Sequence, residues 1–381
     1  MTLRRTTAAI LIGAVCNSMG LAQAPSPDPA AQISRQERLK VFDKAWEAID
    51  RHFYDPKFNG IDWPGMRVKY RPAAEDAEDK IQLQIVIDRM LRELGTSHTA
   101  LRGAWSLGMG FGSIQVGDQW LVRWVSPDSP VTRAGVRRGW LIQGITGECT
   151  RLGNKVSLQF LDLRGQKQSL ETTCGRYPGA VDTRNAITPT LPAGAVYFRL
   201  ADFTDGADKA LAKYVRTHRS APAFVLDLRE NWGGSGDTLV RCLDLFLREK
   251  TVVGHIRNRR GKTTTYRAGG KNDPYEGRLF ILIDQRSGSS AEVFANVMQE
   301  TGRATIVGRR SQGGVLGGEF FNLTNGFSIH VPVWDITTAK GVRLEGRGVT
   351  PDEAVTLTIA DFREDHDGDL DRVRGLLSAK P

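Results

Sequence analysis

Apolar and polar residues follow three different patterns along the chain, and these patterns divide it into regions. From residue 34 to 95, apolar residues recur at near-helical spacing, which predicts helices. From 103 to 175, short segments such as 120–125 alternate in a way that is typical of strands. From 190 to 360, continuous apolar runs alternate with helical segments, which predicts buried strands and helices in an α/β arrangement.

The 381 residues are enough for two or three domains, each with its own core. We expect a signal peptide at 1–22, a flexible leader at 23–33, an N-terminal helical domain at 34–100, a small β domain at 103–175, an α/β core at 190–360 and a C-terminal helix within 361–381.

One stretch of the expected core carries the clearest chemical signal. The apolar run 279–283 predicts a buried strand, 287–290 a tight turn of small residues, and 291–301 a helix. A serine in such a turn exposes its hydroxyl and has its N–H near a helix N-terminus, as suits a nucleophile whose attack creates an oxyanion. On this stretch alone, the alternative is that the serines only cap the helix.

Two other segments of the expected core are rich in glycine. A second apolar run, 223–229, predicts a buried strand that leads into residues 230–236. Glycines there allow the backbone to approach a ligand closely, although a turn with positive φ angles would need them as well. Residues 309–318 are also glycine-rich, and we expect a mobile loop there.

Two polar segments have both a functional and a structural interpretation. His98 follows a Gly-Thr-Ser turn, and it is either a candidate base, since the ordinary imidazole pKa lies near 6.5, or a loop residue without function. The acidic residues 365–369 suggest a calcium loop, but the glycine is misplaced for an EF-hand, so we favour a cap for a helix at 370–377. With no zinc-type spacing and no phosphate-binding loop, the sequence predicts neither a metal nor a cofactor.

The first 22 residues have the features of a secretory signal peptide. Arg4 and Arg5 are followed by a short apolar core, which is too short to span a bilayer, and then by small residues. This predicts export to a periplasm or to the exterior. A lipoprotein anchored through Cys16 is the less favoured alternative, because Val15 is a poor match for the preceding position.

Export would place the cysteines in an oxidising compartment. Three remain after the leader, and this odd number means that at least one is unpaired or pairs outside the chain. Cys149 and Cys174 flank one small module and are the preferred disulfide pair. Cys242 lies in an apolar helical pattern, which favours burial.

The composition is that of a soluble globular protein, with 25% charged residues. The formal net charge is +9, or +7 without Arg4 and Arg5, and the basic residues are scattered. Nucleic-acid binding would require a basic stripe or a known motif, and neither is present. The mild positive charge favours contact with peptide carboxylates or, transiently, with an anionic membrane surface.

Several of these motifs, in this order, resemble the tail-specific or carboxy-terminal processing serine peptidases of family S41. Residues 227–234 are similar to the Asp-Leu-Arg-x-Asn-x-Gly-Gly segment of that family, 287–292 to its nucleophile segment, and 341–352 to its terminal core motif. The resemblance extends from about residue 40 to 377. It implies an α/β, ClpP/crotonase-like core with an inserted PDZ domain at 103–175 and an N-terminal helical domain.

The resemblance also implies roles for residues of the core. It makes Ser289 the nucleophile, and it forms the oxyanion hole from the N–H of Ser290 and that of either Gly233 or Gly234. In one branch of the family the base is a lysine 25 residues after the nucleophile, and that position is Gly314 here.

The other, tricorn-like branch uses a Ser-His-Ser-Glu tetrad without a lysine, a metal or a cofactor. Ser97 and His98 match its serine and histidine, and Glu345 matches its glutamate. The alternative for Glu345 is an ordinary surface carboxylate. A Ser-Lys protease stays the nearest mechanistic rival, with Lys340 as the residue to test, although a solvated turn is the simpler interpretation of that lysine.

The resemblance to a PDZ domain rests on a loop and on the spacing of several glycines. Gly108, Met109, Gly110 and Phe111 are similar to the loop that receives a peptide carboxylate, whereas Trp140 stands where the family usually has aspartate. A PDZ groove would bind an extended peptide by strand addition. The alternative is a module that only packs on the core.

The expected function is therefore that of an exported serine endopeptidase that hydrolyses peptide bonds through an acyl-enzyme. Its expected substrates are unstructured or C-terminal segments of peptides and proteins. Two other classes stay open: a catalytically idle protein that binds a ligand or peptide on the same fold, and a scaffold protein that uses only the PDZ groove.

Overall fold

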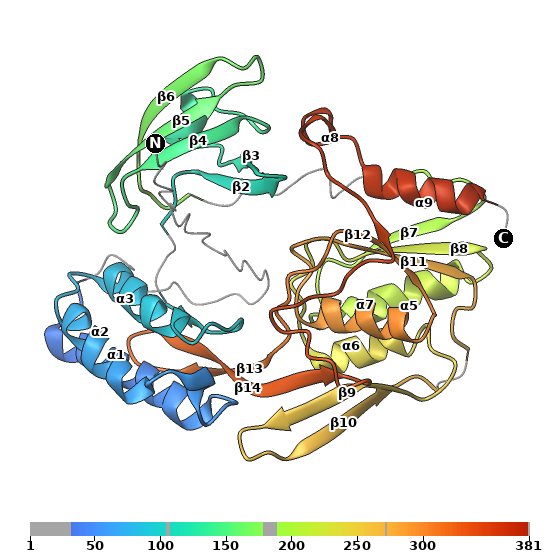
Figure 1. Ribbon diagram of the computed structural model, residues 1–381, viewed down its shortest axis with the longest axis horizontal. Coiled ribbons are helices and arrows are strands. Elements are labelled where there is room, and N and C mark those ends of the chain that lie inside the picture. The colour runs from blue at the N-terminus through green and yellow to red at the C-terminus, as the bar shows by residue number, and fades with distance from the viewer. Residues whose placement is uncertain (1–31, 104–106, 178–188, 271–272, 380–381) are drawn as a thin grey trace, which may run out of the picture. The chain divides into compact units, whose positions relative to one another are not determined.

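The structure is a computed structural model that describes residues 32–103, 107–177, 189–270 and 273–379 (Figure 1). The chain forms two compact units: residues 104–181 with the short segment 78–82, and residues 34–77, 83–103 and 182–381. The expected signal peptide at 1–22, with Cys16, and most of the expected leader at 23–33 lie outside the described residues.

The helices expected between residues 34 and 95 are present. The first begins at Ser34, whose hydroxyl accepts from the N–H of Glu37 while the Glu37 carboxylate accepts from the Ser34 N–H, a capping box that fixes the helix start. Its apolar side packs around the fully buried Phe42 and Trp63. The helices are α1 (Arg35–His52), a 3-10 turn (Phe58–Gly60), α2 (Trp63–Glu75) and α3 (Lys80–Arg92).

The core of the larger unit is a parallel sheet with helices on both faces (Figure 1). Its strand order is β15-β12-β11-β8-β7, and every neighbouring pair is parallel. The strands are β7 (Val196–Arg199), β8 (Ala223–Asp227), β11 (Arg278–Ile283), β12 (Thr305–Gly308) and β15 (Glu353–Ala354); the helices are α5 (Ala207–Thr217), α6 (Gly236–Leu243), α7 (Ser290–Glu300), α8 (Ile359–Glu364) and α9 (Gly368–Ser378).

The two central strands are apolar throughout because helices cover both of their faces. Phe224 and Ile281 point into a core shared with α5, α6 and α7, whereas the adjacent Val225 and Leu282 pack against α9. Because all strands run in the same direction, the segments after β8 and β11 emerge at the same edge of the sheet, where ligands of open α/β sheets bind.

A second sheet of the same unit is antiparallel and carries a histidine to that edge. Its longest strand, β14, pairs with β13 and β1 at one end and with β9 at the other. His98 lies two residues before β1. The strands are β1 (Ala100–Arg102), β9 (Thr251–Asn258), β10 (Thr263–Ala268), β13 (Gly317–Asn322) and β14 (Ser328–Thr338).

The smaller unit is a five-stranded antiparallel sheet of order β2-β3-β4-β5-β6, packed around Val122, Val156 and Phe160. Cys149 and Cys174 form a disulfide in this unit, with Cα atoms 5.4 Å apart, and Cys242 of the larger unit is free and buried. The elements are β2 (Phe111–Val116), β3 (Gln119–Val125), α4 (Pro130–Arg133), β4 (Leu141–Thr146), β5 (Lys155–Leu161) and β6 (Lys167–Thr173).

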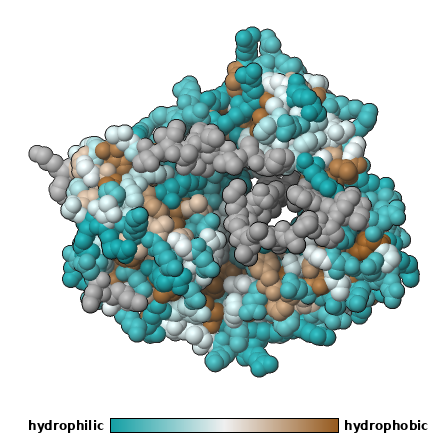
Figure 2. Space-filling view, turned by 180° about the vertical axis from the view of Figure 1, so that it is seen from behind, coloured by the Kyte–Doolittle hydropathy of each residue, from teal (hydrophilic) through white to brown (hydrophobic). Residues whose placement is uncertain are grey.

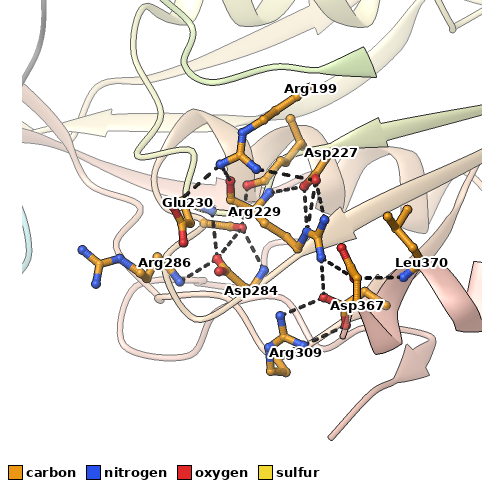
Figure 3. A network of polar contacts seen from close by, with 12 residues as sticks. Arg199, Asp227, Arg229, Glu230, Asp284, Arg286, Arg309, Asp367 and Leu370 are labelled. Carbon is orange, nitrogen blue, oxygen red and sulfur yellow. Dashed lines mark hydrogen bonds and ion pairs between the residues drawn. The ribbon is translucent and has the colours of Figure 1, made fainter. Parts of the chain in front are cut away.

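A buried ion-pair network joins the carboxyl ends of the parallel strands to the start of α9 (Figure 3). Asp227, which is fully buried at the end of β8, pairs with Arg229, and the Arg229 guanidinium also contacts Asp367 and Asp369. Arg309, just after β12, donates to both oxygens of Asp369. These contacts hold the carboxyl ends of β8 and β12 against the start of α9.

The acidic segment 365–369 is therefore part of this network. Asp367 caps α9, since its carboxylate accepts from the Leu370 N–H at 3.1 Å. The prediction of a helix cap in this segment is therefore confirmed. Within the described residues, no group of three or more His, Cys, Asp or Glu side chains is arranged to hold a metal ion.

The expectation of a mobile loop at residues 309–318 is wrong. Ser311 and residues 313–316 are buried, and β13 begins at Gly317. The Gln312 N–H donates to the Ser287 carbonyl, and the Gly313 and Gly314 N–H groups donate to one buried carboxylate, that of Glu292. The glycine content indicated flexibility, but the carboxylate of Glu292, which lies outside this segment, holds its backbone.

Hydrophilic residues predominate on the face of the molecule seen in Figure 2, and hydrophobic ones form small separate patches there. None of the helices in the described part of the chain is both long and apolar enough to cross a membrane.

Candidate active site

Ser289 stands at the turn between β11 and α7, with a backbone conformation that is rare for a residue other than glycine. Its φ and ψ angles are 52° and −122°. Such a conformation costs about 1–3 kcal/mol and persists only where neighbours enforce it. Here the Ser289 N–H is held by the Gly314 carbonyl at 2.9 Å and by the Glu292 carboxylate at 3.1 Å, while the preceding Gly288 N–H donates to Asn231.

His98 lies beside this serine although the two residues are 191 positions apart. The distance between His98 Nε2 and Ser289 Oγ is 3.3 Å, and that between His98 Nδ1 and Ser97 Oγ is 2.7 Å. The Ser97 hydroxyl donates to Glu345 Oε2 at 2.8 Å, and the Ser97 N–H donates to Glu345 Oε1 at 2.8 Å. The four residues thus form one continuous row of hydrogen bonds.

This row determines which nitrogen of His98 carries the proton. The carboxylate of Glu345 only accepts hydrogen bonds, and it also accepts from the Val315 N–H at 2.7 Å. The Ser97 hydroxyl must therefore give its proton to Glu345 and accept from Nδ1–H of His98. The lone pair of Nε2 is then directed at the Ser289 hydroxyl, which is the tautomer that a general base requires.

The environment of His98 favours the neutral imidazole. Burial lowers the His98 pKa below its ordinary value, and the negative charge of Glu345 opposes this shift. Glu345 itself is only partly buried, and three hydrogen bonds hold its carboxylate. It is not the freely solvated surface carboxylate of the alternative interpretation.

Two glycines after β8 lie beside Ser289 and Ser290. A Cβ atom at Gly233 would lie 2.5 Å from Ser289 Cβ and 2.8 Å from Ser290 N, so only glycine fits there. The N–H of Gly233 donates to Asn231 Oδ1 at 2.8 Å, whereas that of Gly234 has no partner among the described residues. Ser290 Oγ donates to the Gly234 carbonyl at 2.8 Å and ties the two loops together.

Two residues that support this geometry entered the sequence analysis only as members of the family motifs at 287–292 and 227–234. Glu292 is fully buried, and its carboxylate accepts from the N–H groups of Ser289, Gly313 and Gly314 and from Ser311 Oγ. Burial raises the Glu292 pKa, and these hydrogen bonds oppose the shift. Its position three residues after Ser289 was the only local signal, because that spacing is typical of a capping box.

Asn231 is the other such residue, and it is also fully buried. Its amide donates to the Leu200 carbonyl, its side-chain oxygen accepts from Gly233, and its backbone carbonyl accepts from Gly288. It therefore joins the glycine loop to the turn that contains Ser289.

The position that carries the lysine base in the other branch lies inside the site. A Cβ atom at Gly314 would lie 3.3 Å from Ser97 Cβ, so Ser97 occupies the space beside it. Lys340 is exposed in the turn that follows β14, where its N–H donates to Thr338.

The four residues of the expected carboxylate loop lie in the smaller unit, just before and at the start of β2. Gly108 pairs with Gly175 through both of its backbone groups, so its N–H is already engaged. The Gly110 carbonyl accepts from Ser126 N–H and Ser129 Oγ, while Met109 and Phe111 pack on the core of this unit.

Comparisons with known proteins show which families this chain is similar to. Residues 194–355 match the model of peptidase family S41, and residues 34–92 match that of the tricorn protease C1 domain. A carboxyl-terminal-processing protease of Synechocystis sp. is 26% identical over 358 residues, covering 86% of this chain and 83% of the relative. The chloroplastic carboxyl-terminal-processing peptidase 2 of Arabidopsis thaliana is 26% identical over 357 residues, covering 83% and 68%.

Solved structures share the fold. The photosystem II D1 C-terminal processing protease matches with a TM-score of 0.54 at 22% identity, covering 87% of this chain and 98% of that one. The tricorn protease matches with a TM-score of 0.55 at 18% identity, covering 90% of this chain and 36% of that one. The α/β core, residues 194–355, is thus matched by peptidase family S41, and most of the chain is similar to carboxyl-terminal-processing proteases.

Proposed function

We propose that this protein is an exported serine endopeptidase in which Ser289, His98, Ser97 and Glu345 act as a catalytic tetrad. The continuous row of hydrogen bonds from Ser289 Oγ to the Glu345 carboxylate carries this proposal. No lysine is needed, because the base position is taken by the imidazole.

In the first half of the reaction, Ser289 Oγ attacks the carbonyl carbon of the scissile peptide bond. His98 Nε2 takes the hydroxyl proton, and Ser97 and Glu345 stabilise the resulting imidazolium through Nδ1–H. His98 then gives the proton to the leaving amine, and the acyl-enzyme forms. In the second half, His98 deprotonates a water molecule that attacks the ester and releases the new carboxyl end.

The oxyanion of each tetrahedral intermediate is proposed to bind the N–H groups of Ser290 and Gly234. Ser290 N lies at the N-terminus of α7, where backbone N–H groups and the helix dipole favour negative charge. We choose Gly234 over Gly233 because Asn231 already occupies the Gly233 N–H. Gly233 supplies the close approach of the two loops instead.

The proposed architecture is a ClpP/crotonase-like core with a PDZ insertion at 103–175 and an N-terminal helical domain at 34–100. The proposed substrates are unstructured or C-terminal peptide segments, since the relatives are named for carboxyl-terminal processing. In the smaller unit β2 is an edge strand that begins at Phe111, directly after residues 108–110, an arrangement that suits strand addition by a peptide. The Cys149–Cys174 disulfide supports export, because disulfides persist in oxidising compartments.

The pH dependence of the reaction tests the assignment of the base. Since burial lowers the His98 pKa, we expect the acid limb of kcat/KM to have its midpoint below the ordinary imidazole value of about 6.5. Activity should rise with pH through that midpoint, because the base must be neutral. Glu345→Gln removes a negative charge that raises the His98 pKa, so the acid limb of kcat/KM in this variant should move to still lower pH. A limb near pH 10, as for a lysine, or no shift in the variant would contradict the assignment.

The function itself is tested by incubating a reduced and alkylated substrate protein with this enzyme, expressed from residue 23 onward. Mass spectrometry of the products should show internal cleavage that does not occur with Ser289→Ala. Peptides that bind but stay intact, together with no reaction of Ser289 with a fluorophosphonate, would identify an idle binding protein. Binding by the 103–175 segment without turnover would identify a scaffold.

A further inference from the structure

A row of three side chains continues from the catalytic histidine along the antiparallel sheet. The ring centroid of His330 lies 5.4 Å from that of His98. The Phe320 ring stacks on His330 with centroids 4.3 Å apart and an angle of 10° between the planes. The guanidinium carbon of Arg102 lies 4.3 Å from the centre of the Phe320 ring. The row therefore leads from the proposed base to a cation.

Strand pairing explains why these three side chains share one face. His330 of β14 is the partner of both Ala100 in β1 and Phe320 in β13, and Arg102 lies two residues beyond Ala100. Directly paired residues and residues two apart point to the same side of a sheet. A Cβ atom at Gly318 would lie 2.3 Å from His330 Nε2, so the glycine provides the space that the imidazole occupies.

The surface of this row is accessible and positively charged. Phe320 is 50% exposed, which is unusual for a large aromatic side chain, and Arg102 is exposed as well. No carboxylate in the described part of the chain forms an ion pair with Arg102. Burial, with smaller contributions from the neighbouring His98 and from the charge of Arg102, lowers the His330 pKa to about 4. His330 is therefore neutral at neutral pH, and the charge of the row is that of Arg102.

We propose that Arg102, Phe320 and His330 form a subsite that selects substrates with a carboxylate close to the scissile bond. The inference rests on the proposed peptidase function and adds a specificity to it. The exposed edge of the Phe320 ring, which lies between His330 and Arg102, supports the apolar part of a substrate residue. The planar guanidinium of Arg102 binds its carboxylate with two hydrogen bonds. The carboxylate comes either from an Asp or Glu side chain or from the free C-terminus of the peptide.

Two pairs of peptides distinguish these sources and test the subsite. In the first pair the C-terminus is a free acid or an amide. The second comparison is made once for each position within three residues of the cut, and there a peptide with Glu is paired with the same peptide carrying Gln. We expect kcat/KM to favour the acid in one of the pairs by about tenfold, the size of one charge-assisted contact. Equal rates in both pairs would overturn the proposal.

Variants then assign the preference to the residue. Arg102→Gln should reduce the ratio of acid to neutral peptide to about one, and Arg102→Lys should keep part of it, since lysine retains the charge but not the planar fork. Arg260→Gln, which removes an exposed arginine of the β9–β10 turn, should leave the ratio as in the wild type. A preference that survives in Arg102→Gln would also overturn the proposal.

A binding measurement separates failure of this inference from failure of the proposed function. In the Ser289→Ala chain, the Kd values of the acid and neutral peptides are compared with and without Arg102→Gln. If the wild type cleaves nothing, the peptidase proposal fails, but an Arg102-dependent preference for the acid would still support the subsite. If peptides are cleaved and no preference exists in cleavage or binding, only the subsite is wrong.

Discussion

Replacement of Ser289 by alanine is expected to lower kcat for peptide hydrolysis by about 10⁴–10⁶-fold. The alanine chain keeps the oxyanion N–H groups and the substrate contacts but has no oxygen to form the acyl-enzyme. Purified variants are compared in a continuous assay with a quenched fluorescent peptide at a saturating concentration. Retention of more than a few per cent of the wild-type rate would contradict the role of this serine as the nucleophile.

A second substitution at the same position separates chemistry from backbone strain. Ser289→Gly should be as inactive as Ser289→Ala but more stable than the alanine variant by about 1 kcal/mol, because glycine adopts φ 52° and ψ −122° without a steric cost. Urea unfolding of the two variants measures the difference. A glycine variant that is less stable than the alanine variant would mean that the turn is not strained.

Glu292→Gln is expected to lower the free energy of unfolding by about 3 kcal/mol, although the substitution keeps the size of the side chain. Each oxygen of the Glu292 carboxylate accepts two hydrogen bonds, one of them from a glycine N–H that cannot turn away. An amide NH₂ in place of either oxygen would face these donors with donors of its own. Urea unfolding measures the loss, and the folded fraction should also hydrolyse peptides more slowly because Ser289 and Gly314 are no longer held.

The matched control is Glu300→Gln, at the other end of the same helix. Glu300 is partly exposed, and its side chain has no hydrogen bond within the described residues, so the variant should change stability by less than about 0.5 kcal/mol. Equal effects of the two substitutions would show that the carboxylate of Glu292 does not organise the loop at 311–314.

The strands and the turn at Ser289 could be predicted because their signals are local. The apolar run before Ser289 and the small residues around it indicate a strand, a turn and a helix, and the structure contains β11 and α7 there. The approach of His98 to Ser289 could be expected only from a resemblance, because the antiparallel sheet carries the histidine across 191 positions. The pattern of apolar and polar residues does not indicate that these two residues lie close together in space.

The supporting contacts could not be predicted for a related reason. Glu292 and Asn231 form hydrogen bonds with backbone groups of loops that are far away in the sequence. Because nearly every residue type carries the same backbone groups, the sequence does not indicate which of them will be the partners. The same carboxylate explains why the glycine-rich segment 309–318 is ordered and not mobile. In the sequence, Asp227 and Arg229 are two charged residues at the end of a predicted strand, and nothing there indicates their partners. The structure shows that their ion pairs connect the end of β8 to the start of α9 (Figure 3).

The central claim is that His98, and not a lysine, activates Ser289. It is tested most directly by the rate at which a fluorophosphonate labels Ser289 at neutral pH in the wild type, His98→Ala and Lys340→Ala. We predict that labelling of His98→Ala is slower by at least about 100-fold, the usual contribution of a general base, and that Lys340→Ala matches the wild type. Rapid labelling of His98→Ala together with loss of labelling in Lys340→Ala would contradict the account.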